Sequence, residues 1–196
     1  PEITDSINLA RHQHGFRKGH STTTALHNIN NFITEGLNKD KPVHRTVAVA
    51  IDLSRAFDTV DHDMLLNDID ELQLNGYIKR FLCAYIRGRQ TYVEFRGSRS
   101  RCRKMLQGVP QGGVLSPLLF NLYMAKIPQP PEGLNLESYA DDTTVLGKGP
   151  THKPVCQLIN QYLDVLDSWF KHRNLFISPT KSSATIFTTF SGDVNI

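Results

Sequence analysis

The sequence has few cysteines, no apolar run of membrane-spanning length and no phosphate-binding glycine loop. Its three cysteines, Cys83, Cys102 and Cys156, are far apart and odd in number. This spacing excludes a disulfide framework and a zinc-finger ligand set, and it indicates a reducing compartment or core positions. The longest apolar stretch, 117–125, is interrupted by an asparagine and has about half of the roughly 18 residues that a membrane-spanning helix needs. The glycine-rich segment 108–113 lacks the GK[ST] of a P-loop.

An initiator methionine and a signal-like N-terminus are also missing, so we expect a piece of a longer protein. At 196 residues the chain is long enough for one hydrophobic core, in one or two lobes. A hydrophobic content of 39% and a charged content of 21% are typical of an ordinary globular chain.

Acidic residues are scarce in one segment, although the net charge is only +3. Between Arg87 and Lys104 the chain carries seven basic side chains and a single acid, Glu94. Such a run is either a solvated surface hairpin or a patch that contacts nucleic-acid phosphates, and both interpretations stay open here. The alternation of side chains in this segment favours core packing for Tyr92 and Phe95 over base stacking.

Hydrophobic periodicity and capping signals predict interleaved helices and strands. Helices are expected at 21–35, 61–75, 77–86, 116–125 and 151–172, with Ser21 and Ser116 as N-caps. Strands are expected at 46–53, 134–139, 143–146 and 184–190, and a basic hairpin at 90–95 and 101–107 turning at Gly97-Ser98. The central strands are expected to be antiparallel, so the predicted class is α+β or an α/β sandwich.

Three carboxylates lie at the ends of apolar β segments. Asp52 closes the strand 46–53, and Asp141 and Asp142 are adjacent in ESYADDTTVL. Taken singly, Asp52 is explained as a cap of the following turn through Ser54, and the aspartate pair as idle turn residues. If the segments are neighbours in one sheet, Asp52 and Asp141 converge, and cations must neutralise them. Oxygen ligands without nearby His or Cys favour Mg²⁺ or Mn²⁺, and two such ions serve in-line phosphoryl transfer.

The residues around these carboxylates resemble a known family. The segments AIDLSRAFDTVDH (50–62), QGVPQGGVLSPLLFN (107–121) and SYADDTTVL (138–146) resemble successive palm motifs of reverse transcriptases, closest to the non-LTR (LINE-like) retrotransposon group. QHGFRKGHSTTTAL (13–26) resembles that group's fingers motif. WFKHRNLFISPTKSSATIF (169–187) resembles the palm motif that follows the double aspartate. Five motifs in the expected order, covering nearly the whole chain, make this a specific resemblance.

The resemblance implies an α+β polymerase palm, an antiparallel sheet backed by helices, with a partial fingers subdomain. Residues 1–45 would be the partial fingers and 46–196 the palm, with a fingers-type helical and basic hairpin insertion at about 62–107. The thumb and the start of the fingers are expected to be absent, and no endonuclease-like or RNase H-like segment is recognised. We therefore expect a polymerase fragment with weak or no processive activity in isolation.

The resemblance also implies a metal site. Asp52 and Asp141 match the metal-binding aspartates, and Asp142 matches the third acidic position, where it would act less directly. The carbonyl of Leu53 or Ile51 is a further expected ligand, with Leu53 the better fit to the family. The expected cofactor is a pair of Mg²⁺ or Mn²⁺ ions.

Further matches concern the substrates. Phe57 matches the aromatic gate that disfavours a ribose 2′-hydroxyl, although a core phenylalanine is the plain alternative. Gln111 and Gly112 match residues near the incoming nucleotide and the template. Lys181 matches a lysine near the leaving pyrophosphate, where a cation stabilises charge and can act as a general acid, unless it is simply a surface lysine. Arg17, in the fingers-like loop, is a candidate contact to triphosphate or template. Asp58 and Asp61 are interpreted as turn and capping residues.

The implied activity is RNA-directed DNA polymerisation with RNA template, DNA primer and dNTPs as partners and no membrane. Its expected place is intracellular, in a nuclear or cytoplasmic ribonucleoprotein if the element is eukaryotic. Two alternatives stay open: a catalytically inactive, maturase-like or decayed module that only binds nucleic acid, and another two-metal phosphotransferase such as an RNA-templated RNA polymerase. Nothing in the sequence indicates the oligomeric state.

Overall fold

The computed structural model describes residues 12–190, and these divide into two compact units. The sheet unit contains residues 12–54 and 127–190, and the helical unit contains residues 55–126. Residues 1–11 and 191–196, which the sequence analysis assigned to the fingers and the palm, lie outside the described part. Within residues 12–190 no helix is both long and apolar enough to cross a membrane.

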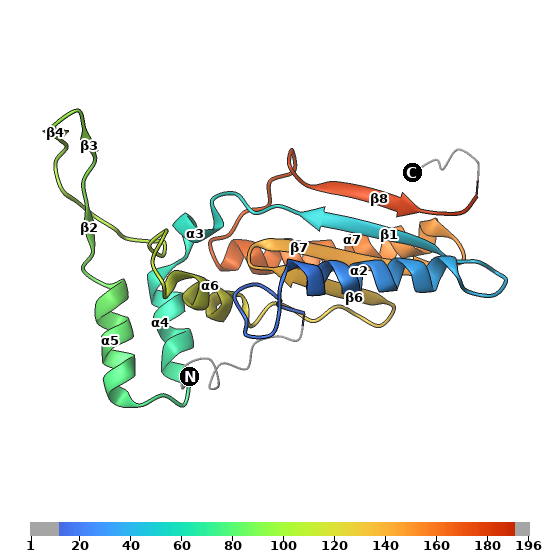
Figure 1. The fold of residues 1–196 in the computed structure, drawn as a ribbon, viewed down its shortest axis with the longest axis horizontal. Helices are drawn as coiled ribbons and strands as arrows, with labels where there is room; N and C mark the ends of the chain where they lie inside the picture. The colour runs from blue at the N-terminus through green and yellow to red at the C-terminus, as the bar shows by residue number, and fades with distance from the viewer. Residues whose placement is uncertain (1–11, 191–196) are drawn as a thin grey trace. The chain divides into compact units, whose positions relative to one another are not determined.

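The sheet unit is built on four antiparallel strands, as expected for the central strands. These strands are β1 (Arg45–Ile51), β6 (Leu134–Tyr139), β7 (Asp142–Gly149) and β8 (Ser183–Phe187). Their order across the sheet is β6-β7-β1-β8, so β1 lies between the hairpin β6–β7 and the late strand β8 (Figure 1). This order places two segments that are about ninety residues apart in the chain side by side.

Two long helices cover opposite faces of this sheet, α2 (Thr22–Leu37) and α7 (His152–His172). A Cβ atom at Gly147 of β7 would lie only 2.7 Å from Val155 Cγ1 of α7. The next residue, Lys148, forms an ion pair of 2.7 Å with Glu35 of α2. Successive strand residues point to opposite faces, so the odd positions of β7 face α7 and the even positions face α2.

Local sequence explains where these two helices form. Ser21 caps α2: its hydroxyl accepts a hydrogen bond from the Thr24 amide, and the Thr24 side chain accepts one from the Ser21 amide. Helix α7 keeps an apolar stripe at helical spacing, and its buried residues are Val155, Ile159, Tyr162, Leu166 and Phe170. Both helices agree with the sequence-based prediction to within about two residues.

The helical unit contains four helices, α3 (Ala56–Thr59), α4 (His62–Glu71), α5 (Gly76–Ile86) and α6 (Ser116–Met124). Helix α6 is buried along most of its length, with Phe120 and Tyr123 fully buried. Asp61 caps α4, with its carboxylate accepting a hydrogen bond of 2.9 Å from the Met64 amide. Its predicted capping role is therefore confirmed.

The end of one helix and the N-cap of another differ from the prediction. Helix α4 ends at Glu71 instead of residue 75, because the side chain of Asn75 caps the next helix and the residues before it serve as the connection. Ser116 is not the N-cap of α6, which is Leu115. The Ser116 hydroxyl instead donates to the carbonyl of Pro110. The Ser116 hydroxyl therefore stabilises the loop before α6 and does not cap the first amides of the helix.

The basic hairpin is present, in four pieces of two residues each. They are β2 (Gln90–Thr91), β3 (Glu94–Phe95), β4 (Ser98–Arg99) and β5 (Arg103–Lys104). The turn is Arg96-Gly97, one residue before the predicted position, with φ values of 48° and 79°. Positive φ at both central residues is the geometry that joins twisted antiparallel strands in a two-residue turn.

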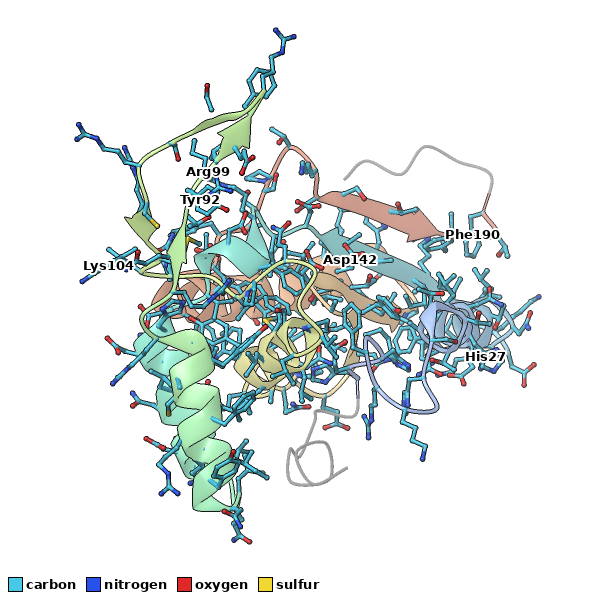
Figure 2. All side chains as sticks on the ribbon, turned by 60° about the vertical axis from the view of Figure 1, so that its left-hand side comes forward. His27, Tyr92, Arg99, Lys104, Asp142 and Phe190 are labelled. Atoms are coloured by element: carbon cyan, nitrogen blue, oxygen red, sulfur yellow. The ribbon has the colours of Figure 1, made fainter. Side chains whose placement is uncertain are left out.

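The prediction that Tyr92 and Phe95 pack into a core is wrong. Their side chains are 47% and 68% exposed, and every residue from 91 to 104 is exposed. Figure 2 labels Tyr92, Arg99 and Lys104 on this hairpin. Alternating side chains do not predict burial here, because no helix or second sheet of the same unit packs on either face of the hairpin.

Candidate active site

Two strand ends meet where the candidate carboxylates lie. In the pairing of β1 with β7, Ile51 lies opposite Thr143. Continuing this register by one residue places Asp52, just after β1, beside Asp142 at the start of β7. The hairpin from β6 to β7 turns through Ala140 and Asp141, because Tyr139 pairs with Asp142. The sequence predicted that these strand ends converge, and the fold places them next to each other at the same end of the two central strands.

Asp52 is held by its backbone, while one of its carboxylate oxygens has no hydrogen-bond partner. Its amide donates to Ser182 Oγ at 3.1 Å, and its carbonyl accepts from the Ser178 amide at 2.8 Å. Its Oδ1 atom is buried without a hydrogen bond. The Ser54 amide donates to the Phe176 carbonyl, so the capping explanation of Asp52 through Ser54 is wrong. A buried carboxylate oxygen without a partner is costly unless a cation approaches it.

Lys181 places a positive charge near Asp52. Its Nζ lies 3.9 Å from Asp52 Oδ1, beyond hydrogen-bond distance, and its side chain is 70% exposed. An ion pair this open contributes little to stability, because solvent screens it. Lys181 is therefore close to the candidate site without neutralising it.

Asp141 is half-buried, and burial is the main cause that raises the pKa of its carboxyl above the ordinary value. The neighbouring charges of Asp142 and Asp52 raise that pKa further, and a backbone hydrogen bond opposes them. The charge of Asp52 is the smallest of these causes. Burial therefore makes the negative charge of Asp141 unfavourable unless a cation lies near it.

Asp142 has different surroundings. It is exposed, opens β7 and lines a groove of about 230 Å³ together with Thr22, Ala25 and Leu26 of α2. Its side chain therefore belongs to the face of the sheet that α2 covers. The alternative that both aspartates share the turn is wrong, since only Asp141 is a turn residue.

The carboxylates of Asp52 and Asp141 suit a hard divalent cation, but they supply only part of its ligands. Within residues 12–190, no group of three Asp, Glu, His or Cys side chains is gathered closely enough to hold a metal. Mg²⁺ in phosphoryl-transfer sites is commonly held by one or two carboxylates, with water and substrate phosphates completing the octahedron. The carboxylates of Asp52, whose Oδ1 atom has no hydrogen bond, and of Asp141 are oxygen ligands of the kind that this arrangement needs.

The carbonyl of Leu53 does not accept a hydrogen bond in the pairing of its strand segment. Leu53 lies opposite Ile177 in an isolated antiparallel bridge. The two hydrogen bonds of that bridge use the carbonyls of Asp52 and Phe176. This pattern is consistent with the predicted ligand role of the Leu53 carbonyl, which stays a prediction.

Phe57 belongs to the helical unit, where it lies in α3. Its ring is partly exposed and stacks on the buried ring of Phe120, with centroids 4.4 Å apart and planes 20° apart. One side of the ring therefore contributes to the core of the unit. Both the gate and the core interpretations of Phe57 are compatible with this position.

Gln111 and Gly112 form an exposed turn in the same unit. The side-chain Nε2 of Gln111 donates a hydrogen bond of 2.9 Å to Oδ1 of Asp58, the residue after Phe57. Gly112 has a φ of 79°, and a Cβ atom added to it would meet no heavy atom within 4 Å. The turn therefore has free space beside Gly112 and is hydrogen-bonded to α3 through Gln111.

Arg17 lies in the sheet unit, in the loop between the turns at Gly15-Phe16 and Lys18-Gly19. Its carbonyl accepts a hydrogen bond of 3.1 Å from the His20 amide. Nothing in this loop identifies a triphosphate or template contact, so its predicted role stays a prediction.

Sequence reasoning missed one residue that reaches the aspartate turn. The side chain of Gln13 forms hydrogen bonds with both backbone groups of Ala140. The only sequence signal was its place in the fingers-like motif, and that motif implied no role for it.

The sheet, its covering helices and the acidic strand ends define a polymerase palm. Telomerase from Candida tropicalis, solved in complex with a TWJ fragment of telomeric RNA, has the same fold with a TM-score of 0.70. The match covers 94% of this chain and 32% of that chain at 14% sequence identity.

The chain belongs to the family "Reverse transcriptase (RNA-dependent DNA polymerase)", whose model matches residues 2–190. The probable RNA-directed DNA polymerase from transposon BS of Drosophila melanogaster is 34% identical over 193 residues, 95% of this chain and 21% of that protein. The RNA-directed DNA polymerase from mobile element jockey of the same organism is 31% identical over 97% of this chain and 21% of that protein. The resemblance to non-LTR retrotransposon enzymes is thus confirmed, and the chain spans about a fifth of the length of these relatives.

Proposed function

We propose that the chain carries the polymerising centre of an RNA-directed DNA polymerase. The primer 3′-hydroxyl gives up its proton to solvent and its oxygen bonds to the α-phosphorus of a dNTP, the bond from that phosphorus to the leaving oxygen breaks, and pyrophosphate departs. The observation that supports this most directly is the buried Asp52 Oδ1 without a hydrogen bond, beside an Asp141 whose pKa is raised by burial. Family membership supplies the reaction that such a carboxylate pair serves.

Asp52 and Asp141 are proposed to hold two Mg²⁺ or Mn²⁺ ions, with help from the Leu53 carbonyl and less direct support from Asp142. When bound, such ions supply charge neutralisation and lower the pKa of the attacking hydroxyl. The chain itself would hold the carboxylates of Asp52 and Asp141 in fixed positions at the ends of the two central strands. The exposed ammonium of Lys181 is proposed to donate a hydrogen bond or proton to the leaving pyrophosphate.

The residues of the helical unit are proposed to select the nucleotide. Phe57 would exclude a 2′-hydroxyl with the ring side that does not stack on Phe120. The Gln111-Gly112 turn would approach the new base pair, because a glycine backbone permits close contact. Arg17 is proposed to contact triphosphate or template from the fingers-like loop.

The exposed hairpin 90–104 is proposed to bind the RNA template. Arg99 lies over the ring of Tyr92 at 4.8 Å and Arg96 over that of Phe95 at 5.2 Å. Exposed aromatic rings beside guanidinium groups are suited to stack on unpaired RNA bases, while the remaining basic side chains contact phosphates.

The proposal is tested by primer extension on an RNA template with Mg²⁺, using the full-length protein. Asp52→Ala and Asp141→Ala are expected to reduce extension by at least about 100-fold, while Asp164→Ala, an exposed acid on α7, leaves it unchanged. If both site variants extend primers at the wild-type rate, the mechanism is wrong. RNA binding without any Mg²⁺-dependent extension in the wild type would instead favour the inactive binding module.

A further inference from the structure

The turn that presents Asp141 begins at a residue in an unfavourable backbone conformation. Ala140 has a φ of 58°, in the left-handed region that residues with a Cβ rarely adopt. In a two-residue hairpin turn with positive φ at the first central position, glycine is the usual residue. Non-glycine residues persist in this region only where surrounding contacts enforce it. Contacts to Ala140 are therefore informative about how the turn is held.

One buried side chain contacts both backbone groups of Ala140. Gln13 is only 4% exposed, its Oε1 accepts a hydrogen bond of 2.9 Å from the Ala140 amide, and its Nε2 donates one of 3.1 Å to the Ala140 carbonyl. These two bonds fix the peptide planes on both sides of Ala140. The second of those planes contains the amide of Asp141, so its orientation controls where the Asp141 side chain starts.

The segment that carries Gln13 is itself fastened to β6. Gln13 lies opposite Ser138 in a parallel bridge, where the His14 amide donates to the Ser138 carbonyl and the Ser138 amide donates to the His12 carbonyl, both at 2.8 Å. The rings of Phe16 and Tyr139 follow, with centroids 6.2 Å apart. Gln13 therefore has little freedom to move away from the turn.

Gly15 shows how closely this segment approaches the turn. A Cβ atom at this position would overlap with the backbone nitrogen of Ala140. The Gly15 amide also donates a hydrogen bond of 2.8 Å to Gln13 Oε1. Gln13 Oε1 accepts hydrogen bonds from both the Gly15 and the Ala140 amides. Residues 13–15 therefore pack against the aspartate turn as one unit.

We propose that Gln13 is a positioning residue for catalysis, which holds Ala140 in its left-handed conformation and thereby sets the Asp141 carboxylate toward Asp52. The inference rests on the proposed function. In this role Gln13 acts through the backbone of Ala140 and not through a contact of its own with the reacting groups. Its loss is expected to misplace one carboxylate of the acid pair rather than to remove it.

The test uses primer extension by the full-length protein, with kcat, KM for primer-template and the Mg²⁺ concentration for half-maximal rate as readouts. Gln13→Ala is expected to lower kcat by about 10- to 100-fold and to raise the Mg²⁺ requirement, with KM for primer-template unchanged. Gln13→Met keeps the side-chain volume but loses both hydrogen-bonding groups, so its effect on kcat is expected to match that of Gln13→Ala. Gln161→Ala, at an exposed position on α7, is the matched control and is expected to behave as wild type.

A second substitution separates positioning from plain structural support. Glycine adopts a φ of 58° readily, so Ala140→Gly combined with Gln13→Ala is expected to recover at least about threefold in kcat over Gln13→Ala alone. A merely structural Gln13 predicts no recovery, because the buried amide and carbonyl of Ala140 would still lack their partners. If Gln13→Ala does not fold, Gln13→Met and its combination with Ala140→Gly carry the same comparison.

The outcomes distinguish the two proposals. A wild-type protein without Mg²⁺-dependent extension overturns the proposed function. An active wild type together with folded Gln13 variants that keep wild-type kcat and Mg²⁺ dependence overturns the positioning role alone. Equal loss of activity with and without Ala140→Gly also overturns it.

Discussion

At the scale of single residues, Asp141 and Asp142 are neighbours in the chain but lie in different surroundings. Asp141 is a half-buried turn residue whose carboxyl pKa is raised by burial and then by adjacent carboxylates. Asp142 is exposed at the start of β7 and lines the groove against α2. Two residues that look equivalent in the sequence are therefore expected to respond differently to substitution.

Asp141→Asn is expected to abolish Mg²⁺-dependent extension and, without metal, to stabilise the fold, since it removes a half-buried charge. A gain of about 1 kcal/mol would raise the melting temperature by roughly 2–4 °C in a chain of this size. Asp142→Asn is expected to reduce extension less and to leave the melting temperature nearly unchanged. Equal Mg²⁺ affinity in the two variants would contradict this asymmetry.

Phe57→Ala is expected to admit ribonucleotides, measured as the ratio of kcat/KM for rNTP to that for dNTP. The substitution also removes the stack on Phe120 and is expected to cost about 1–3 kcal/mol of stability. Phe120→Leu is the matched control, because it disturbs the same stack from the buried side. If both variants lose stability and neither admits rNTPs, Phe57 is only a core residue.

The residues of the candidate site differ in how far sequence alone identifies them. The acids at 52, 141 and 142 are recognisable because they lie at the ends of apolar strands within family motifs. Gln13 is not recognisable in this way, because its partner Ala140 is 127 residues away and the contact is to backbone atoms. A backbone contact leaves no complementary residue type in the sequence.

At the scale of elements, long amphipathic helices and apolar strands were predictable, whereas short and irregular segments were not. Helices α2 and α7 have enough turns for their apolar period to be recognised directly. Helix α3 has four residues and begins after Arg55 with a φ of 50°, so neither period nor cap indicates it. The two-residue strands of the basic hairpin are likewise too short to carry a pattern.

The basic hairpin is an element whose proposed role has a quantitative test. Arg101→Gln combined with Arg103→Gln is expected to weaken RNA binding and to reduce the slope of log K against log salt by about 1.4, since each single-strand phosphate that is no longer neutralised removes about 0.7. Lys39→Gln combined with Lys153→Gln, at exposed positions of the sheet unit, is the charge-matched control. An equal reduction in the control would mean that net charge, not the hairpin, determines RNA binding.

At the scale of the whole molecule, the sheet order could not be predicted from the sequence, although antiparallel pairing could. Strand β1 pairs with β7 and β8, both from the last third of the chain, and no local signal marks these pairings. The sheet that results gathers acidic charge at the end of β1, and an exposed lysine offsets it only in part. A fold with such a site is expected to gain stability when a divalent cation binds.

Mg²⁺ is therefore expected to raise the melting temperature of this chain. A ligand that binds only the folded state at ten times its dissociation constant adds about 1.4 kcal/mol, equivalent to roughly 3–6 °C here. The combination of Asp52→Asn with Asp141→Asn should start at a higher melting temperature than wild type and show no Mg²⁺-dependent rise. Thermal unfolding in MgCl₂ is compared with KCl at equal ionic strength, since salt also screens repulsion between the carboxylates. An equal rise in both salts, or a rise retained by the double variant, would show that the acid pair does not bind the cation.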